Sequence, residues 1–184
     1  MADANTPERS EAAEYYFRYI DLVPDGDICA TLEAQLPETM MLLAGVPQNR
    51  VDYRYAADKW TIREVLGHLN DTERLFAFRA FWFARGFESS LPSFDQGVAF
   101  THAQAAQRSW SSHLDEFRSL RTSTILFFRG LPPEAWLRRG IASDNPFTVR
   151  ARLSRRRTRH SSSADPARAL PLKGRQIVHC RPTF

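Results

Sequence analysis

Cysteine is scarce in this sequence of 184 residues, which has two, Cys29 and Cys180. Two cysteines far apart in the chain provide neither a disulfide framework nor a zinc cluster. A long apolar run is also absent: the most apolar stretch, LFAFRAFWFA, is interrupted by Arg79 and is too short to span a bilayer. The N-terminal segment is acidic and lacks the apolar core of a signal peptide, so we expect a cytoplasmic protein without a membrane partner.

The sequence also lacks any stretch that alternates between apolar and polar residues as a strand does. Apolar material is plentiful, however, because hydrophobic residues make up 43% of the chain and 13 residues are Phe. This content excludes a wholly disordered chain, and the length favours one domain. We therefore expect an all-α fold.

Three stretches place apolar residues at the spacing of an amphipathic helix. The first covers 28–43, where Pro37 predicts either a kink or two shorter helices. The second begins with the capping-box sequence TIRE at residue 61 and ends near residue 86, before a turn-rich loop. The third covers 105–129 and is followed by a short helical turn opened by proline.

A fourth amphipathic helix would close a bundle, and its place is after Thr148. The sequence of residues 150–184 has no apolar stripe and contains three prolines that break a helix, Pro166, Pro171 and Pro182. We therefore predict an incomplete helical-bundle domain over residues 1–149 and a basic, disordered tail over residues 150–184.

The net charge of +4 comes from that tail. Residues 150–184 contain ten Lys and Arg and one acid, which leaves 15 basic and 20 acidic residues in 1–149. A polybasic arm binds phosphates in a salt-dependent way, so one hypothesis is a non-enzymatic helical scaffold whose tail binds nucleic acid or an acidic partner. The run RRRTRHSSS has no interleaved aromatic residues to stack on bases, which argues against nucleic acid.

His68 is the leading candidate for a site residue. It lies beside the apolar stripe of the second helix, in the run GHLNDTER, with Asp71 one turn later. Position alone leaves two interpretations: a histidine at the edge of the core with a hydrogen-bonded neighbour, or a zinc or nickel ligand that a nearby carboxylate orients. One histidine cannot hold a metal by itself, since a catalytic site needs about three protein ligands.

The remaining candidates carry less chemistry. We expect His113 to pack on the third helix, His102 to lie in a solvated loop and Asp95 to be a turn residue. His160 and His179 fall in the tail. A nucleophile elbow, an HExxH motif and a Gly-rich phosphate loop are all missing, so no catalytic residue is assigned.

Three runs of the sequence together resemble the DinB-like family. They are KWTIREVLGHLNDTERLFAFRAFWFARG, LPSFDQ and LRTSTILFFRGLPPEAWLRRGIASDNPFTVRA, within a resemblance that extends from about residue 15 to residue 151. The sequence is most similar to the damage-inducible branch, which is grouped with bacillithiol transferase. The resemblance implies an up-down four-helix bundle and a divalent-metal-dependent transferase or hydrolase acting on a small-molecule thiol or electrophile. Whether the bundle forms a homodimer is left open.

In that family three histidines hold the metal, one in the GHLxD run and two in an HxxxH pair on the last helix. His68 matches the first ligand. The pair is absent, because the sequence departs from the family after residue 151. The resemblance therefore implies a chain that is deficient in its metal site and binds zinc or nickel weakly or not at all.

A frameshift near codons 148–152 would account for the departure. Synonymous codons exist for the run from Arg150 to Leu172 that also spell, in another frame, ALAYLAAGHDIHHLRILRERYL followed by a stop. This hidden string has the apolar periodicity of a helix and contains an HxxxH pair. The two histidines of this HxxxH pair would stand where the sequence has Thr158 and Ser162.

Overall fold

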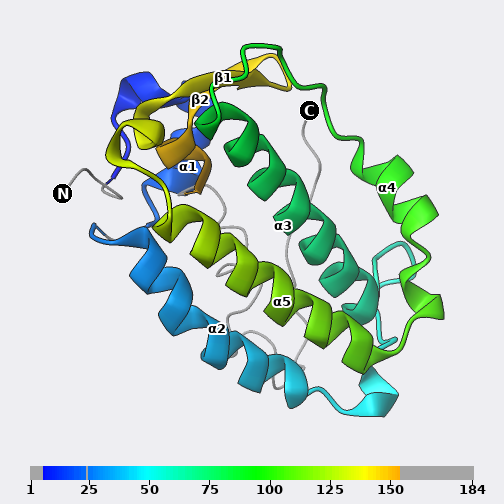
Figure 1. The fold of residues 1–184 in the computed structure, drawn as a ribbon. Coiled ribbons are helices and arrows are strands. Elements are labelled where there is room, and N and C mark those ends of the chain that lie inside the picture. Colours follow the sequence, from blue (N-terminus) through cyan, green and yellow to red (C-terminus); the bar gives the residue numbers. More distant parts are fainter. Residues whose placement is uncertain (1–5, 24, 154–184) are drawn as a thin grey trace.

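The computed structural model describes residues 6–23 and 25–153 of the chain. Its three long helices are α2 (Ile28–Ala44), α3 (Ile62–Ala84) and α5 (Trp110–Arg129), and α5 lies between the other two (Figure 1). The shorter α4 (Gln96–Ala103) flanks α3 on the side away from α2. The remaining elements are α1 (Phe17–Ile20), β1 (Arg139–Ala142), β2 (Asn145–Thr148) and the 3-10 turns Arg9–Glu11, Glu14–Tyr16, Gln48–Arg50, Ala105–Gln107 and Pro133–Leu137.

The three long helices confirm the mostly helical class expected from the sequence. The α3 helix begins with the predicted capping box, in which the Glu64 amide donates to the Thr61 hydroxyl at 3.2 Å and the Thr61 amide donates to the Glu64 carboxylate at 2.7 Å. Pro37 lies inside α2, which continues as one helix from Ile28 to Ala44. Of the two alternatives left open for this segment, two separate helices are therefore excluded.

The third helix is shorter than predicted, and the segment before it has structure of its own. Residues 105–107 form a 3-10 turn, and α5 begins only after Ser109, whose hydroxyl accepts from the Ser112 amide at 3.1 Å. His102 lies in the last turn of α4 and not in a loop as expected. Asp95 starts that helix, because its carboxylate accepts from the amides of residues 97 and 98.

A two-stranded antiparallel hairpin, β1–β2, is an element that the sequence did not indicate. Its strands have four residues each, too few for a detectable alternation. The connecting residues Ser143 and Asp144 both have positive φ, 53° and 58°, as a tight hairpin turn requires. Gly140 is needed in β1, because a Cβ atom there would lie 2.0 Å from the Phe83 ring.

The core has a large apolar cluster at the hairpin end of the bundle and a smaller one at the opposite end. Between α3 and α5, the fully buried Glu73 and Arg121 form an ion pair. Packing continues to the end of the described chain, where Leu153 is buried and Arg150 bonds to the buried Glu11. Within the described residues, no helix is both long and apolar enough to span a bilayer.

Candidate functional site

His68 lies in the second turn of α3, where its ring is part of an aromatic layer. The Trp60 ring lies 5.0 Å from the His68 ring and stacks on Phe100 of α4 at 4.7 Å and an interplanar angle of 4°. One turn along α3, the Thr72 hydroxyl donates to the His68 carbonyl at 2.7 Å and lies 3.4 Å from Nε2. The half-buried His68 is therefore held at the edge of the core by rings and a hydroxyl.

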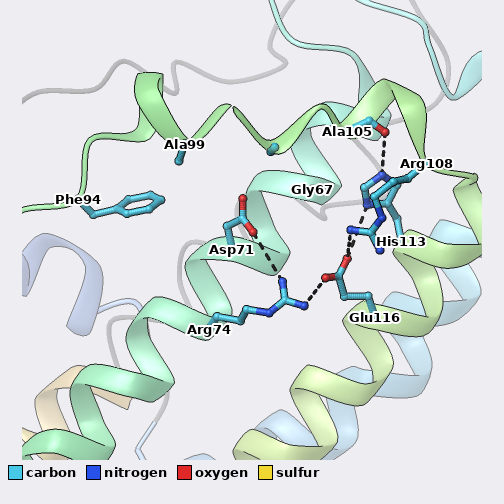
Figure 2. A pocket seen from close by; sticks show the side chains of 10 residues that line it. Gly67, Asp71, Arg74, Phe94, Ala99, Ala105, Arg108, His113 and Glu116 are labelled. Atoms are coloured by element: carbon cyan, nitrogen blue, oxygen red, sulfur yellow. Dashed lines mark hydrogen bonds and ion pairs between the residues drawn. The ribbon is translucent and has the colours of Figure 1, made fainter. Parts of the chain in front are cut away.

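A cavity of about 330 Å³ lies next to this layer, between α3, α4 and the N-terminal part of α5 (Figure 2). Asp71, which the sequence places one turn after His68, is in its wall. Among the described residues, its lining is Gly67, Asp71, Arg74, Phe94, Ala99, Ala103, Ala105, Arg108, His113 and Glu116. The cavity thus has a charged side, formed by α3 and α5, and an apolar side, formed by Phe94 and the alanines.

Glu116 is the centre of the charged side. Its carboxylate accepts from Arg74, from Arg108 at 2.7 Å and from the Asn70 amide at 3.0 Å. Burial alone would raise the pKa of Glu116, but the hydrogen bonds from the two arginines outweigh it and hold the pKa below its ordinary value. Glu116 therefore stays ionised and keeps both guanidinium groups in place.

Asp71 is in a different electrostatic state. Its nearest cation is Arg74, at 3.6 Å, a distance too long for a hydrogen bond. Burial raises the pKa of Asp71, and the attraction of Arg74 offsets only part of that rise. Neighbouring groups therefore stabilise the negative charge of Asp71 less than that of Glu116.

His113 is 1% exposed and packs on α5 as expected, but its ring also lines the cavity. Its Nε2 lies 3.0 Å from the Ala105 carbonyl, which can only accept, so Nε2 carries a proton. Its Nδ1 has no hydrogen-bond partner and lies 3.9 Å from the Glu116 carboxylate. In the neutral ring, Nδ1 is then a buried acceptor without a donor.

The described residues alone do not fit a metal ion. Within residues 6–23 and 25–153, no group of three His, Cys, Asp or Glu side chains could hold one. Thr158 and Ser162, the positions where the resemblance implies the other two ligands, lie outside the described residues, as do His160, His179 and Cys180.

Sequence reasoning singled out His68, Asp71 and His113, of which Asp71 and His113 line the cavity, but it missed Arg74, Arg108 and Glu116. Arg74 follows Asp71 by three residues, a spacing that places both on one face of α3. Glu116 follows His113 by three residues on α5 in the same way. A signal that could have indicated these residues is the presence of polar residues beside the apolar stripes. Asn70 on α3, for example, is polar but only 1% exposed.

The comparisons with known proteins agree with this architecture. The model of the DinB superfamily matches residues 31–155. No curated protein matches the chain. Among solved structures, YfiT from Bacillus subtilis, described as a probable metal-dependent hydrolase with an unusual four-helix bundle topology, is 17% identical with a TM-score of 0.58. That similarity covers 84% of this chain and 85% of YfiT, and it shows a shared bundle fold.

A second similar structure is the mycothiol-dependent maleylpyruvate isomerase, with 11% identity and a TM-score of 0.64. The alignment covers 79% of this chain and 62% of the isomerase. At these identities the two structures establish the fold and not the activity. Because the family model covers well over half of the sequence, the chain belongs to the DinB superfamily.

Proposed function

We propose that this chain is a DinB-superfamily protein of the metal-dependent thiol transferase or hydrolase type, with a metal site that is incomplete as encoded. The observation that carries the proposal is the setting of His68, which matches the first family ligand but has no two further ligands among the described residues. Thr158 and Ser162 stand where the family pair would be. A chain with one such imidazole binds zinc or nickel weakly and has no metal-dependent activity.

Metal retention tests this proposal directly. The purified, metal-free chain is dialysed against Zn²⁺ or Ni²⁺ and its metal content is measured by elemental analysis. We expect no stoichiometric retention and no difference between the chain and His68→Ala. The matched control is His102→Ala, which removes an exposed histidine on α4. Stoichiometric retention that His68→Ala abolishes and His102→Ala preserves would refute the proposal.

The frameshift is part of the same proposal, and the described residues support a narrower position for it. The Arg150 guanidinium donates to the buried Glu11 carboxylate, which also accepts from the Thr148 hydroxyl at 2.6 Å. Arg150 is itself 8% exposed, so its side chain is packed within the bundle. The change of frame is therefore expected after codon 150.

Sequencing the gene from genomic DNA across codons 145–175 tests the frameshift. We expect one nucleotide to be gained or lost relative to the present sequence. The corrected chain, with histidines at positions 158 and 162, should then retain one metal ion that His68→Ala removes. DNA that agrees with the present sequence throughout would contradict the frameshift and make the incomplete site a property of the protein itself.

The charge of the tail favours a second candidate function. Residues 150–184 have a tenfold excess of basic over acidic residues, whereas residues 1–149 are acidic overall. A scaffold with a binding tail should bind DNA or an acidic polypeptide with an affinity that falls steeply with salt. Because residues up to Leu153 are buried in the bundle, the test uses a deletion of residues 154–184. Equal binding by the full and shortened chains would eliminate this function.

A further inference from the structure

The outward side of α3 has a line of exposed and half-exposed side chains that includes two phenylalanines. They follow one another at alternating spacings of three and four residues, which places them on one face of the helix. They are Asp71, Arg74, Phe78, Phe81 and Arg85, and we call them the α3 face. Phe78 is 48% exposed and Phe81 is 38% exposed. Neighbouring half-exposed rings between charged residues are typical of a contact surface.

The apolar part of the α3 face continues onto α5. The centroid of the Phe81 ring lies 6.3 Å from that of the partly buried Phe127 ring. The Arg85 guanidinium lies over both rings, with its carbon 5.4 Å from the Phe81 centroid and 5.8 Å from the Phe127 centroid. Because the buried pair of Glu73 and Arg121 already joins α3 to α5, this surface is presented by a packed part of the bundle.

The two ends of the α3 face have opposite charges. At one end, Arg85 has no carboxylate partner among the described residues. At the other end, the side chain of Asp71 is 36% exposed and lies 3.6 Å from Arg74. Each of the two end residues is seven positions, or about two helical turns, from Phe78. Two copies related by a two-fold axis at Phe78 therefore bring Asp71 of each copy beside Arg85 of the other.

The same charges disfavour other arrangements of two α3 helices. In a parallel pair each residue faces its own counterpart, so Arg85 would face Arg85 and Asp71 would face Asp71. In an antiparallel pair centred between Phe78 and Phe81, Arg74 would face Arg85 of the second copy. Like charges opposite each other oppose association, so the charges select the antiparallel register centred on Phe78.

From this arrangement we propose that the α3 face is the contact surface between two copies of this chain, packed as antiparallel helices around Phe78. The contact buries the Phe78 and Phe81 rings of both copies, and each Arg85 pairs with Asp71 of the second copy. The surface is small, so the dissociation constant should be about micromolar. The proposal is independent of metal binding, because His68 is not part of the α3 face.

Analytical ultracentrifugation of the full-length chain tests the proposal, with EDTA present so that metal ions cannot link the copies. Over protein concentrations from about 1 to 500 µM, the average mass should rise from that of one chain toward that of two. Phe78→Ser should raise the dissociation constant at least about tenfold. The matched control Met41→Ser changes an apolar side chain on α2 that is 76% exposed, and it should leave the dissociation constant unchanged. A chain that stays monomeric throughout, or equal association of folded Phe78→Ser, would overturn the proposal.

A charge exchange tests the register. Arg85→Asp and Asp71→Arg each place like charges opposite one another, so each should raise the dissociation constant at least about tenfold. The double variant restores opposite charges in exchanged positions, so its dissociation constant should return to within about threefold of the unaltered chain. Circular dichroism verifies that each variant is folded, and the exposed position of Arg85 allows its substitution without a change in the core. A folded double variant that associates no better than the single variants would also overturn the proposal.

Discussion

Glu73 and Arg121 join α3 to α5 through a buried ion pair, and its removal is a sharp test of the packing of the bundle. Glu73 Oε1 lies 3.2 Å from Arg121 Nε, and Glu73 Oε2 lies 3.3 Å from Arg121 Nη2. Both side chains are almost fully buried, 0% and 2% exposed. Burial lowers the pKa of Arg121 to about 10, which leaves the guanidinium charged at pH 7.

The substitution Glu73→Gln keeps the size of the side chain and removes its charge. Arg121 then remains buried as a cation whose main counter-charge is gone, and breaking such a pair costs about 3–5 kcal/mol. The glutamine carbonyl can still accept one of the two hydrogen bonds, so we expect a loss near the lower limit, about 3 kcal/mol. Against a typical domain stability of about 5–15 kcal/mol, this loss is large.

Urea unfolding followed by circular dichroism at 222 nm measures the free energy of unfolding of each variant. The double variant Glu73→Gln/Arg121→Met should lose less stability than the sum of the two single losses, with a coupling energy of at least about 1.5 kcal/mol. The control is Asp115→Asn, because Asp115 and Arg118 form an exposed pair on α5 and should change stability by less than about 0.5 kcal/mol. A loss below about 1 kcal/mol for Glu73→Gln, without coupling, would show that the pair is not buried as described.

Two other substitutions test the hairpin end of the bundle. Burial would raise the pKa of Glu11, but hydrogen bonds from Arg150 and Thr148 outweigh it and lower the pKa. The stability from Glu11 is then present above its unfolded pKa of about 4.3 and is lost as pH falls toward the folded value, so acid unfolding should depend less on pH in Glu11→Gln. Gly140→Ala would place Cβ 2.0 Å from Phe83, so it should lower the free energy of unfolding, measured by calorimetry, by about 1–3 kcal/mol. The control Gly130→Ala, whose Cβ has its nearest contact at 3.4 Å, should lower it less. Equal losses in the two variants would contradict the close approach of Gly140 to Phe83.

The helices could be predicted from the sequence because their signals are local. The capping box of Thr61 and Glu64 lies within four residues, and the apolar periodicity of α2, α3 and α5 repeats over several turns. The start of α5 was misplaced because the apolar pattern does not show where a short 3-10 turn gives way to an α-helix. The cap that decides it, Ser109, is one of several serines in the same run.

The hairpin was missed for a related reason. Each strand has four residues, and the register depends on the positive φ angles of Ser143 and Asp144 rather than on a glycine at the turn. Asn-Gly or Asp-Gly is the usual sequence signal for such a turn, and neither occurs here. The hairpin also packs closely on α3 where Gly140 meets Phe83, a contact between residues far apart in the chain.

The candidate site was predictable only in the part carried by a single helix. His68 and Asp71 are three residues apart on α3, so one sequence run contains both. The cavity needs α5 as well, since Glu116 binds Arg74 across the two helices, and no spacing within one run indicates which residues of α3 and α5 face each other. The unpaired Nδ1 of His113 also depends on the 3-10 turn at Ala105, because the Ala105 carbonyl determines which ring nitrogen carries the proton.

Two observations bear on where the proposed change of frame begins. The buried bond between Arg150 and Glu11 joins residues at the two ends of the described chain, so Arg150 is part of the bundle. The match to the DinB superfamily ends at residue 155, five residues later. Under the proposed frameshift, a break within this short interval leaves His68 unchanged, and positions 158 and 162, which the resemblance implies for the HxxxH pair, follow the break. The gain or loss of one nucleotide would then be sufficient to explain why the sequence has one of the three histidines that the resemblance implies.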